Sequence, residues 1–141
     1  MGEAREVMDR VTGAAFSQDS EALKALYAPE AVAETPDQGT ISGRDEIVAY
    51  LGEFLRAFPD ASFESAYEHE SGATAIDEGY VVGTHTGPLT GPTGEAIEGT
   101  GKHVRMRSCD VATVEGGVVT SHRFYFDNLD LLEQLGLAPG A

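Results

Sequence analysis

Two aspartates and two histidines are the side chains of this sequence best suited to proton transfer. Asp110, His122 and Asp127 lie in its last third, and His85 lies in the segment Gly-Thr-His-Thr-Gly. A carboxylate or an imidazole held in a dry cavity can act as a general base or acid. Whether these side chains meet depends on the strands and helices that carry them.

Asp110 alternates with apolar residues along a strand predicted at 102–114. It shares one face with Met106 and Ala112, and the apolar face of a strand points to the interior. An inward carboxylate is either paired or has a raised pKa, and raised pKa values mark functional sites. The alternative is a structural hydrogen bond to His122, to Ser108 or to a tyrosine. The sequence leaves both interpretations open.

The strand predicted at 118–127 carries His122 and ends at Asp127. Alternation places His122 on the same face as Phe124 and Phe126, and Asp127 on the opposite face. Asp127 also directly precedes a short apolar helical pattern. It is therefore either a proton acceptor at the rim of a cavity or the N-cap of a final helix.

His85 lies on a strand predicted at 74–86, and Gly83 and Gly87 leave space above its face. It is either an acid or base, or a structural hydrogen-bonding group. The four histidines and the acidic residues show no close spacing typical of metal ligands. No phosphate-binding or dinucleotide-binding fingerprint is present. We therefore expect neither a metal nor a cofactor.

Amphipathic helices are predicted in the first half of the chain and strands in the second. The clearest helical pattern covers 47–58 and ends at Pro59, which cannot continue the hydrogen-bond ladder. Residues 36–43 and 87–101 are rich in glycine and proline and are predicted as loops. The last two strands are joined by a tight Gly-Gly turn at 116–117.

Helices followed by hairpin-linked strands argue for one antiparallel α+β domain over residues 1–141. An amphipathic helix packed in a curved sheet leaves a concave interior, where we expect a pocket for a small apolar ligand. Six side chains are expected to contact that ligand: Phe16, Phe54, Phe58, Met106, Phe124 and Phe126.

The composition excludes several classes of partner. A net charge of −15 argues against nucleic acid and anionic membrane surfaces. No apolar stretch approaches the roughly 18 residues of a membrane span, and the charged residues 1–10 do not resemble a signal peptide. The single cysteine, Cys109, cannot form an intrachain disulfide and is interpreted as a packing residue. We expect a cytoplasmic protein.

Several motifs, taken in order, resemble a known family. Residues 22–36 and 43–60 are similar to the first half of a nuclear-transport-factor-2-like domain. In the second half, GTHTGPL at 83–89, the Pro-Thr-Gly of the long loop, the Asp-Val strand before Glu-Gly-Gly, and FD…LLEQLG at 126–136 resemble SnoaL-like polyketide cyclases. The resemblance implies a cone-shaped α+β domain, in which a curved antiparallel sheet packs on N-terminal helices around a central pocket. It also implies a homodimer formed through the sheet.

The resemblance further implies cofactor-free acid–base chemistry of the cyclase or isomerase type on an apolar ligand such as a polyketide. Such ester cyclases serve bacterial secondary metabolism. The family's base follows a histidine and a tryptophan on the last strand, and this pattern falls on His122, Arg123 and Phe124. Because phenylalanine cannot take a proton, we assign the chemistry to Asp110 with His85 or His122, and Asp127 as a further candidate. The alternative, which Phe124 favours, is a non-catalytic small-molecule-binding protein of the same fold.

Overall fold

The computed structural model describes residues 2–91 and 93–137. Its helices are α1 (Glu3–Phe16), α2 (Ser20–Ala25), α3 (Arg44–Ala57) and α4 (Asn128–Gln134). Its strands are β1 (Tyr27–Thr35), β2 (Gly39–Ser42), β3 (Ser62–Ser71), β4 (Thr74–Thr84), β5 (Leu89–Thr90), β6 (Ala96–Ile97), β7 (His103–Glu115) and β8 (Val118–Phe126). Pro92, part of the long-loop motif noted in the sequence, lies outside the described residues.

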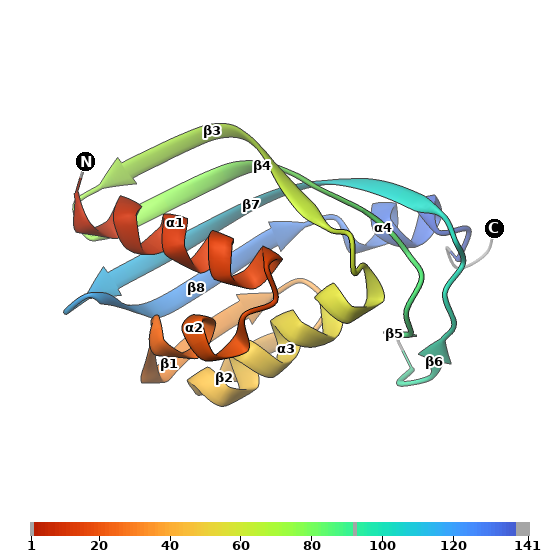
Figure 1. Ribbon diagram of the computed structural model, residues 1–141, viewed down its shortest axis with the longest axis horizontal. Coiled ribbons are helices and arrows are strands. Elements are labelled where there is room, and N and C mark those ends of the chain that lie inside the picture. The colour runs from red at the N-terminus through yellow and green to blue at the C-terminus, as the bar shows by residue number, and fades with distance from the viewer. Residues whose placement is uncertain (1, 92, 138–141) are drawn as a thin grey trace.

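Six strands form one curved sheet in the order β2-β1-β8-β7-β4-β3, and β5 pairs with β6 in a separate hairpin (Figure 1). The neighbouring strands are antiparallel except β1 and β8, which run parallel. The predicted α+β architecture is therefore confirmed, but the sheet is mixed. β8 pairs with β7 along one edge, through the hairpin, and with β1 along its other edge. Because β1 and β8 are far apart in the sequence, the local residue pattern gives no sign of their pairing.

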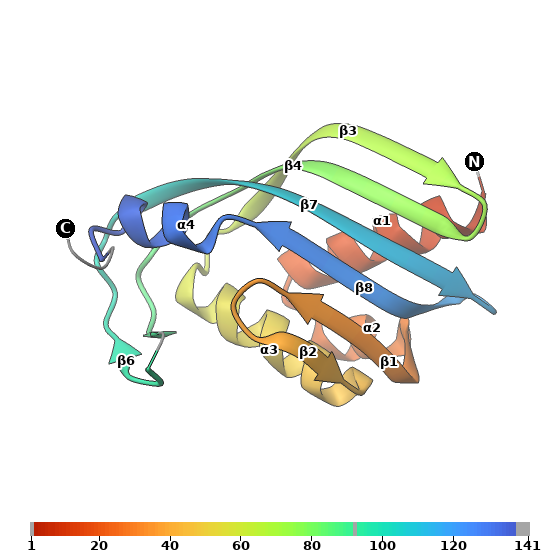
Figure 2. The ribbon, with the colours of Figure 1, turned by 180° about the vertical axis from the view of Figure 1, so that it is seen from behind.

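The helices α1, α2 and α3 all lie on one face of the sheet (Figure 1). On the opposite face, α4 lies against the start of β7, and the rest of this face of β3, β4, β7 and β8 carries no helix in the described part of the chain (Figure 2). Burial along β4 alternates strictly, so every second side chain points toward the helices. The core between these layers is built on α1, with Val7, Met8 and Val11 almost fully buried against the sheet.

The first strand is longer than its sequence pattern suggests. β1 begins at Tyr27 and runs through Pro29, which would be expected to end the preceding helix instead. The register of β1 with β8 is interrupted between Tyr27 and Val32. A proline is tolerated there because no ladder bond is required of its nitrogen. β2 and the β5–β6 hairpin lie within segments predicted as loops; all three strands are short.

A close approach at Gly79 shapes the sheet beside the cavity. A Cβ atom at this position would lie 2.2 Å from the carbonyl oxygen of Glu64 on β3. The register between β3 and β4 shifts at the same place, between Ser65 and Tyr67. Because glycine permits this contact, β3 bends over the helical layer and Phe63 turns toward the interior.

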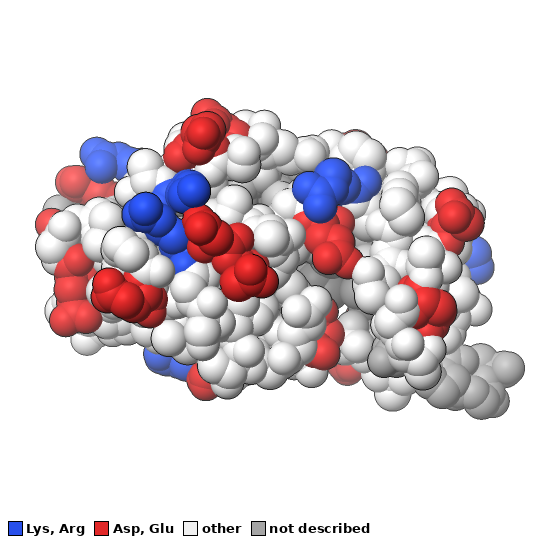
Figure 3. Space-filling view, turned by 90° about the horizontal axis from the view of Figure 1, so that it is seen from below, with Lys and Arg blue, Asp and Glu red and all other residues white. Residues whose placement is uncertain are grey.

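Within residues 2–91 and 93–137, none of the helices combines the length and the apolar character that crossing a membrane requires. The acidic side chains are numerous on the face shown in Figure 3, where they are spread among a few lysines and arginines. On this face the negative charge does not gather into one patch.

Candidate functional site

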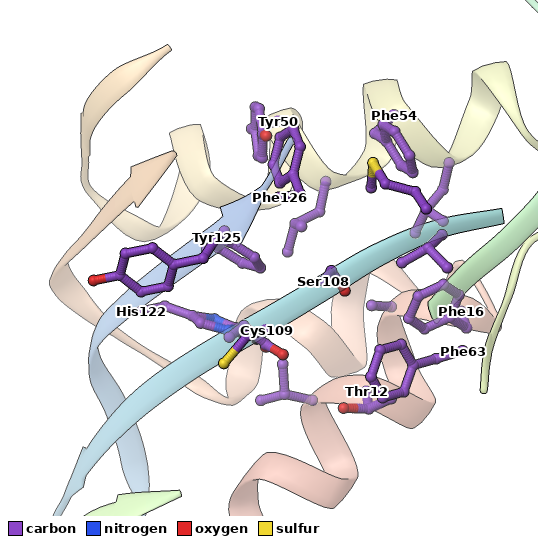
Figure 4. Close-up of a pocket in the computed structure, with 18 residues that line it drawn as sticks. Thr12, Phe16, Tyr50, Phe54, Phe63, Ser108, Cys109, His122, Tyr125 and Phe126 are labelled. Carbon is purple, nitrogen blue, oxygen red and sulfur yellow. Dashed lines mark hydrogen bonds and ion pairs between the residues drawn. The ribbon is translucent and has the colours of Figure 1, made fainter. Parts of the chain in front are cut away.

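An apolar cavity of about 100 Å³ lies between α1, α3 and the inner face of the sheet. Aromatic rings surround it: Phe16 comes from α1, Tyr50 and Phe54 come from α3, and Phe126 comes from β8 (Figure 4). The remaining lining residues are Val11, Thr12, Ala15, Leu51, Leu55, Phe63, Val81, Met106, Ser108, Cys109, Asp110, His122, Phe124 and Tyr125. Among the residues that the structure describes, Asp110 is the only carboxylate that lines the cavity.

An outer vestibule of about 420 Å³ shares part of its wall with this cavity. Tyr50, Phe54 and Phe126 line both spaces. The vestibule is more polar, because Asp37 and Glu53 contribute to its wall. The Tyr50 hydroxyl donates to Asp37 Oδ1 at 2.9 Å, which holds this ring in the shared wall.

Asp110 belongs to a short hydrogen-bonded chain behind the cavity. His122 Nε2 lies 2.6 Å from Asp110 Oδ2, and His122 Nδ1 lies 2.6 Å from the Tyr27 hydroxyl. The His122 side chain is only 2% exposed, whereas that of Asp110 is 18% exposed. The carboxylate therefore faces the cavity, and the imidazole supports it from the core. The predicted inward direction of Asp110 is confirmed.

The burial of Tyr27 keeps the proton on its hydroxyl. Burial, assisted by the charge of Asp110, raises the pKa of the Tyr27 hydroxyl far above its ordinary value. The hydroxyl forms its hydrogen bond with His122 Nδ1, and the other ring nitrogen, Nε2, forms the hydrogen bond with Asp110 Oδ2. One carboxylate oxygen is occupied by this bond, and the other remains for a ligand.

Phe124 completes the wall beside the imidazole. Its ring stacks on the His122 ring with 4.0 Å between the two centroids. The Tyr50 ring lies on another side, with 6.3 Å between its centroid and that of Phe124. Phe124 stands opposite Asp110 in the β7–β8 register. The position of the family's base is thus an apolar ring packed next to a carboxylate that comes from the neighbouring strand.

A second inward carboxylate, Asp77, stands opposite Asp110 in the β4–β7 register. Its Oδ1 accepts from the Arg5 guanidinium at 2.6 Å, and both side chains are nearly buried. Burial raises the pKa of the Asp77 carboxyl, and the hydrogen bond from Arg5 opposes this rise without cancelling it. Thr12, which lines the cavity, approaches Asp77 Oδ2 at 3.5 Å.

His85 lies apart from the cavity. Its Nδ1 accepts from the Thr100 backbone at 3.2 Å, and its Nε2 is buried with no hydrogen-bond partner among the described residues. Burial lowers the pKa of His85 and keeps the ring neutral. The space that these glycines leave is occupied: a Cβ atom at Gly83 would lie 3.3 Å from Phe58 Cβ, and one at Gly87 would lie 2.2 Å from the carbonyl oxygen of Arg56 at the end of α3. A catalytic role for His85 stays a prediction.

Asp127 caps the final helix. Its Oδ1 accepts from the Asp130 backbone at 3.0 Å, which confirms the N-cap interpretation. A groove lies on the outer face of the sheet, and Asp127 is one of the residues that line it. Asp127 is not among the residues of the inner cavity. The structure therefore brings Asp110 and His122 together and leaves Asp127 on the other side of the sheet. A catalytic role for Asp127 stays a prediction.

Five of the six side chains expected to contact a ligand line the cavity: Phe16, Phe54, Met106, Phe124 and Phe126. Phe58 does not, because it is buried behind Phe54, with 4.9 Å between the two ring centroids. Within the described ranges, no group of three or more histidine, cysteine, aspartate or glutamate residues is placed to hold a metal ion.

Sequence reasoning missed Tyr27, Arg5 and Asp77. Asp77 carried a usable signal, because it alternates with Ala75 and Gly79 on the inward face of β4. The signal for Arg5 is weaker: it precedes Met8 at helical spacing, on the buried face of α1. Nothing local marks Tyr27, because its role depends on the parallel pairing of β1 with β8.

The fold and this cavity define a class: cone-shaped α+β domains that enclose an apolar pocket. The family profile of SnoaL-like polyketide cyclases matches residues 5–135. The chain belongs to this family, as its motifs predict. No curated protein sequence is similar enough to match the chain.

Solved structures agree on the fold. A protein from Jannaschia sp. CCS1, assigned as a SnoaL-like polyketide cyclase, matches with a TM-score of 0.85 and 16% identity, over 97% of this chain and 94% of that chain. IdmH from Streptomyces antibioticus, assigned as a polyketide cyclase, matches with a TM-score of 0.80 and 22% identity, over 96% and 99%. A Catenulispora acidiphila protein with a ketosteroid-isomerase-like fold, solved with trimethylamine, matches with a TM-score of 0.74 and 18% identity, over 94% and 93%.

Proposed function

We propose that this protein is an enzyme that performs cofactor-free proton transfer on an apolar small molecule, of the cyclase or isomerase type. The observation that carries the proposal is Asp110, a carboxylate that faces an apolar cavity and is held in place by its hydrogen bond with the His122 imidazole. A base in this setting is sheltered from water and fixed in direction, which favours abstraction of a carbon-bound proton.

In the proposed reaction, Asp110 removes a proton from a carbon next to a ligand carbonyl and becomes a carboxylic acid. The electron pair moves to the carbonyl oxygen, giving an enolate. In the cyclase branch, the enolate carbon attacks a second carbonyl of the same molecule, and the alkoxide formed takes the proton back from Asp110. In the isomerase branch, a different carbon of the enolate takes the proton back from Asp110. Ser108 lines the cavity two residues from Asp110 on the same strand face, about 7 Å along β7. Its hydroxyl is our candidate donor to the enolate oxygen.

The size of the site supports a ring-shaped ligand. An engineered apolar cavity of roughly 150 Å³ holds benzene, so the inner cavity of about 100 Å³ accepts about one small ring after modest adjustment. The remainder of a larger molecule, such as a polyketide, would pass Tyr50 and occupy the vestibule. A planar aromatic ligand fits walls made largely of aromatic rings.

A simple ketone tests the chemistry without knowledge of the natural substrate. The exchange of the α-protons of 1-tetralone with solvent deuterium is followed by proton NMR, with and without the protein. We expect the wild-type protein to accelerate exchange and the Asp110→Asn variant to lose at least about 100-fold of that acceleration. Asp127→Asn is the matched control, because that carboxylate caps α4 on the other side of the sheet. Equal exchange by wild type and Asp110→Asn would rule out Asp110 as the base.

The second candidate function is a non-catalytic binding protein of the same fold. Phe124 favours it, since an apolar ring stands where the family has its base. In that case 1-tetralone would bind saturably, as seen by chemical-shift changes, and the protein would leave its exchange rate unchanged. Turnover thus separates the two functions, and binding alone does not.

Assembly and location remain further proposals. The outer face of the sheet exposes Tyr67 and Tyr125, and the Arg105 guanidinium lies 3.5 Å from the centre of the Tyr80 ring on the same face. We propose that two copies pair through this face as a homodimer, tested by light scattering with Tyr125→Glu as the disrupting variant. A cytoplasmic location is proposed because the single cysteine requires no oxidising compartment.

A further inference from the structure

The two inward carboxylates of the sheet are neighbours. Asp77 on β4 and Asp110 on β7 are direct register partners, and both point to the helical side. Side chains in such pairs have Cβ atoms about 4.5–5.5 Å apart. Two negative charges at this spacing oppose each other's ionisation. Consistent with this, the charge of Asp110 is among the causes that raise the pKa of Asp77, after burial.

Arg5 supplies a fixed positive charge next to this pair. Besides its 2.6 Å bond to Asp77, its guanidinium donates to Asp9 Oδ1 at 2.8 and 3.0 Å. It also donates to the carbonyl oxygens of His69 at 3.4 Å and Ile76 at 3.3 Å. Every guanidinium nitrogen is thus engaged, and the side chain is only 3% exposed. Arginine keeps its charge at all ordinary pH values, so this cation is permanent.

Asp77 itself does not reach the cavity. It is absent from the lining residues, and Thr12 lies between it and the cavity, with the hydroxyl 3.5 Å from Asp77 Oδ2. A ligand in the cavity would therefore contact Asp110 and not Asp77. Any influence of Asp77 on the chemistry has to act through the neighbouring carboxylate.

The titratable groups around Asp110 are few among the described residues. His122 from β8 is hydrogen-bonded to Asp110, and Tyr27 from β1 keeps its proton. Burial raises the pKa of the Cys109 thiol, which keeps this neighbour on β7 neutral. On the far side of Asp77, Glu68 from β3 adds a weaker negative influence. Asp77 is the carboxylate neighbour of Asp110, and Arg5 acts on Asp110 through its bond to Asp77.

We propose that Arg5 and Asp77 are positioning residues for Asp110, and that their balance of charge sets how readily the Asp110 carboxylate accepts a proton. The proposal rests on the proposed function, in which Asp110 is the base. Arg5 comes from α1 and Asp77 from β4, so the packing of the first helix on the sheet determines the strength of a base located on β7.

The deciding experiment is an NMR titration of the Asp110 carboxyl carbon in ¹³C-labelled protein, with the signal assigned by its loss in Asp110→Asn. In Asp77→Asn the neighbouring negative charge is gone and Arg5 remains. We expect the Asp110 midpoint to fall by about one pH unit. In Arg5→Met the midpoint of the coupled Asp77–Asp110 pair should rise by a similar amount. The double variant should return toward the wild-type value.

Arg5→Lys is the conservative control, because it keeps the charge and loses the fork of hydrogen bonds. We expect it to restore most of the wild-type midpoint. A purely structural role for Arg5 would predict no opposite shifts in Arg5→Met and Asp77→Asn. If Arg5→Met does not fold, Asp77→Asn alone decides. An unchanged or higher Asp110 midpoint in Asp77→Asn would overturn the proposal.

This titration needs no ligand, so its outcome is independent of the exchange assay. Loss of 1-tetralone exchange in Asp110→Asn, combined with an unmoved midpoint in Asp77→Asn, would keep the proposed function and remove the further inference. A shifted midpoint in Asp77→Asn, combined with unchanged exchange in Asp110→Asn, would keep the further inference and remove the proposed function.

Discussion

Asp77 and Asp110 occupy equivalent places on adjacent strands and have become different kinds of group. The Asp77 side chain is 4% exposed and bound to a permanent cation, whereas that of Asp110 is 18% exposed and hydrogen-bonded to the His122 imidazole. The Arg5 cation pairs with Asp77 and joins α1 to the sheet. The imidazole orients Asp110, whose side chain lines the cavity. Under the proposed function, the partner and not the residue type separates the structural carboxylate from the base.

The largest effect that tests this contrast is the loss of Arg5. Arg5→Met leaves Asp77 as a buried charge without its cation, and we expect the free energy of unfolding to fall by about 3–5 kcal/mol. The control is Lys24→Met, which breaks the exposed pair of Lys24 with Asp45 and should cost under about 1 kcal/mol. Urea unfolding at neutral pH measures both. Equal losses in the two variants would contradict a structural role for the Arg5–Asp77 pair.

The next effect concerns the support behind Asp110. Tyr27→Phe removes the hydrogen-bond partner of His122 Nδ1, and we expect it to lower the free energy of unfolding by about 1 kcal/mol. Deuterium exchange of 1-tetralone should fall with it, because the imidazole that orients Asp110 is no longer held from its other side. Tyr50→Phe serves as the control in unfolding experiments, since its hydroxyl bonds to Asp37 at an exposed site. A stable Tyr27→Phe variant with full exchange activity would argue against the hydrogen-bonded chain.

A third carboxylate, Asp127, has a local role as the N-cap of α4. Asp127→Ala removes the cap of α4 and should cost about 1 kcal/mol in unfolding experiments. Exchange of 1-tetralone should remain at the wild-type rate, because Asp127 is not among the residues of the inner cavity. A large loss of exchange with little loss of stability would return Asp127 to the catalytic candidates.

The smallest expected effect is a pH dependence at the start of α1. Glu70 accepts from the backbone nitrogens of Arg5 at 3.0 Å and Gly2 at 2.9 Å, and these bonds lower its pKa from 4.5. A lowered pKa in the folded state gives stability that is present above about pH 4.5 and is lost as pH falls through the lowered value. Urea midpoints from pH 7 to pH 3 should fall less steeply in Glu70→Gln than in wild type. Identical slopes would show that Glu70 does not anchor α1.

The sequence predicts what depends on local alternation. The inward direction of Asp110 follows from its apolar neighbours on β7, and the cap at Asp127 follows from the helical pattern after it. The family motifs predict the overall cone-shaped fold. The partners of Asp110 and Asp77 come from elsewhere in the chain: Tyr27 arrives through a parallel pairing and Arg5 through helix–sheet packing. Such long-range contacts leave only weak local signals.

The space beside His85 shows the same limit. Gly83 and Gly87 leave room above its face in the sequence pattern, but the room is taken by Phe58, whose ring centroid lies 5.3 Å from that of His85. A glycine in a strand marks the close approach of another element as well as the close approach of a ligand.

We expect a ligand to meet this protein at Asp110, inside the apolar cavity. The most direct measurement adds 1-tetralone to protein with ¹³C-labelled aspartate and follows the carboxyl signals of Asp110 and Asp127 by NMR. We expect a saturable shift of the Asp110 signal and no shift of the Asp127 signal. A saturable shift at Asp127, with the Asp110 signal unmoved, would place the ligand on the outer face of the sheet and contradict a site at Asp110.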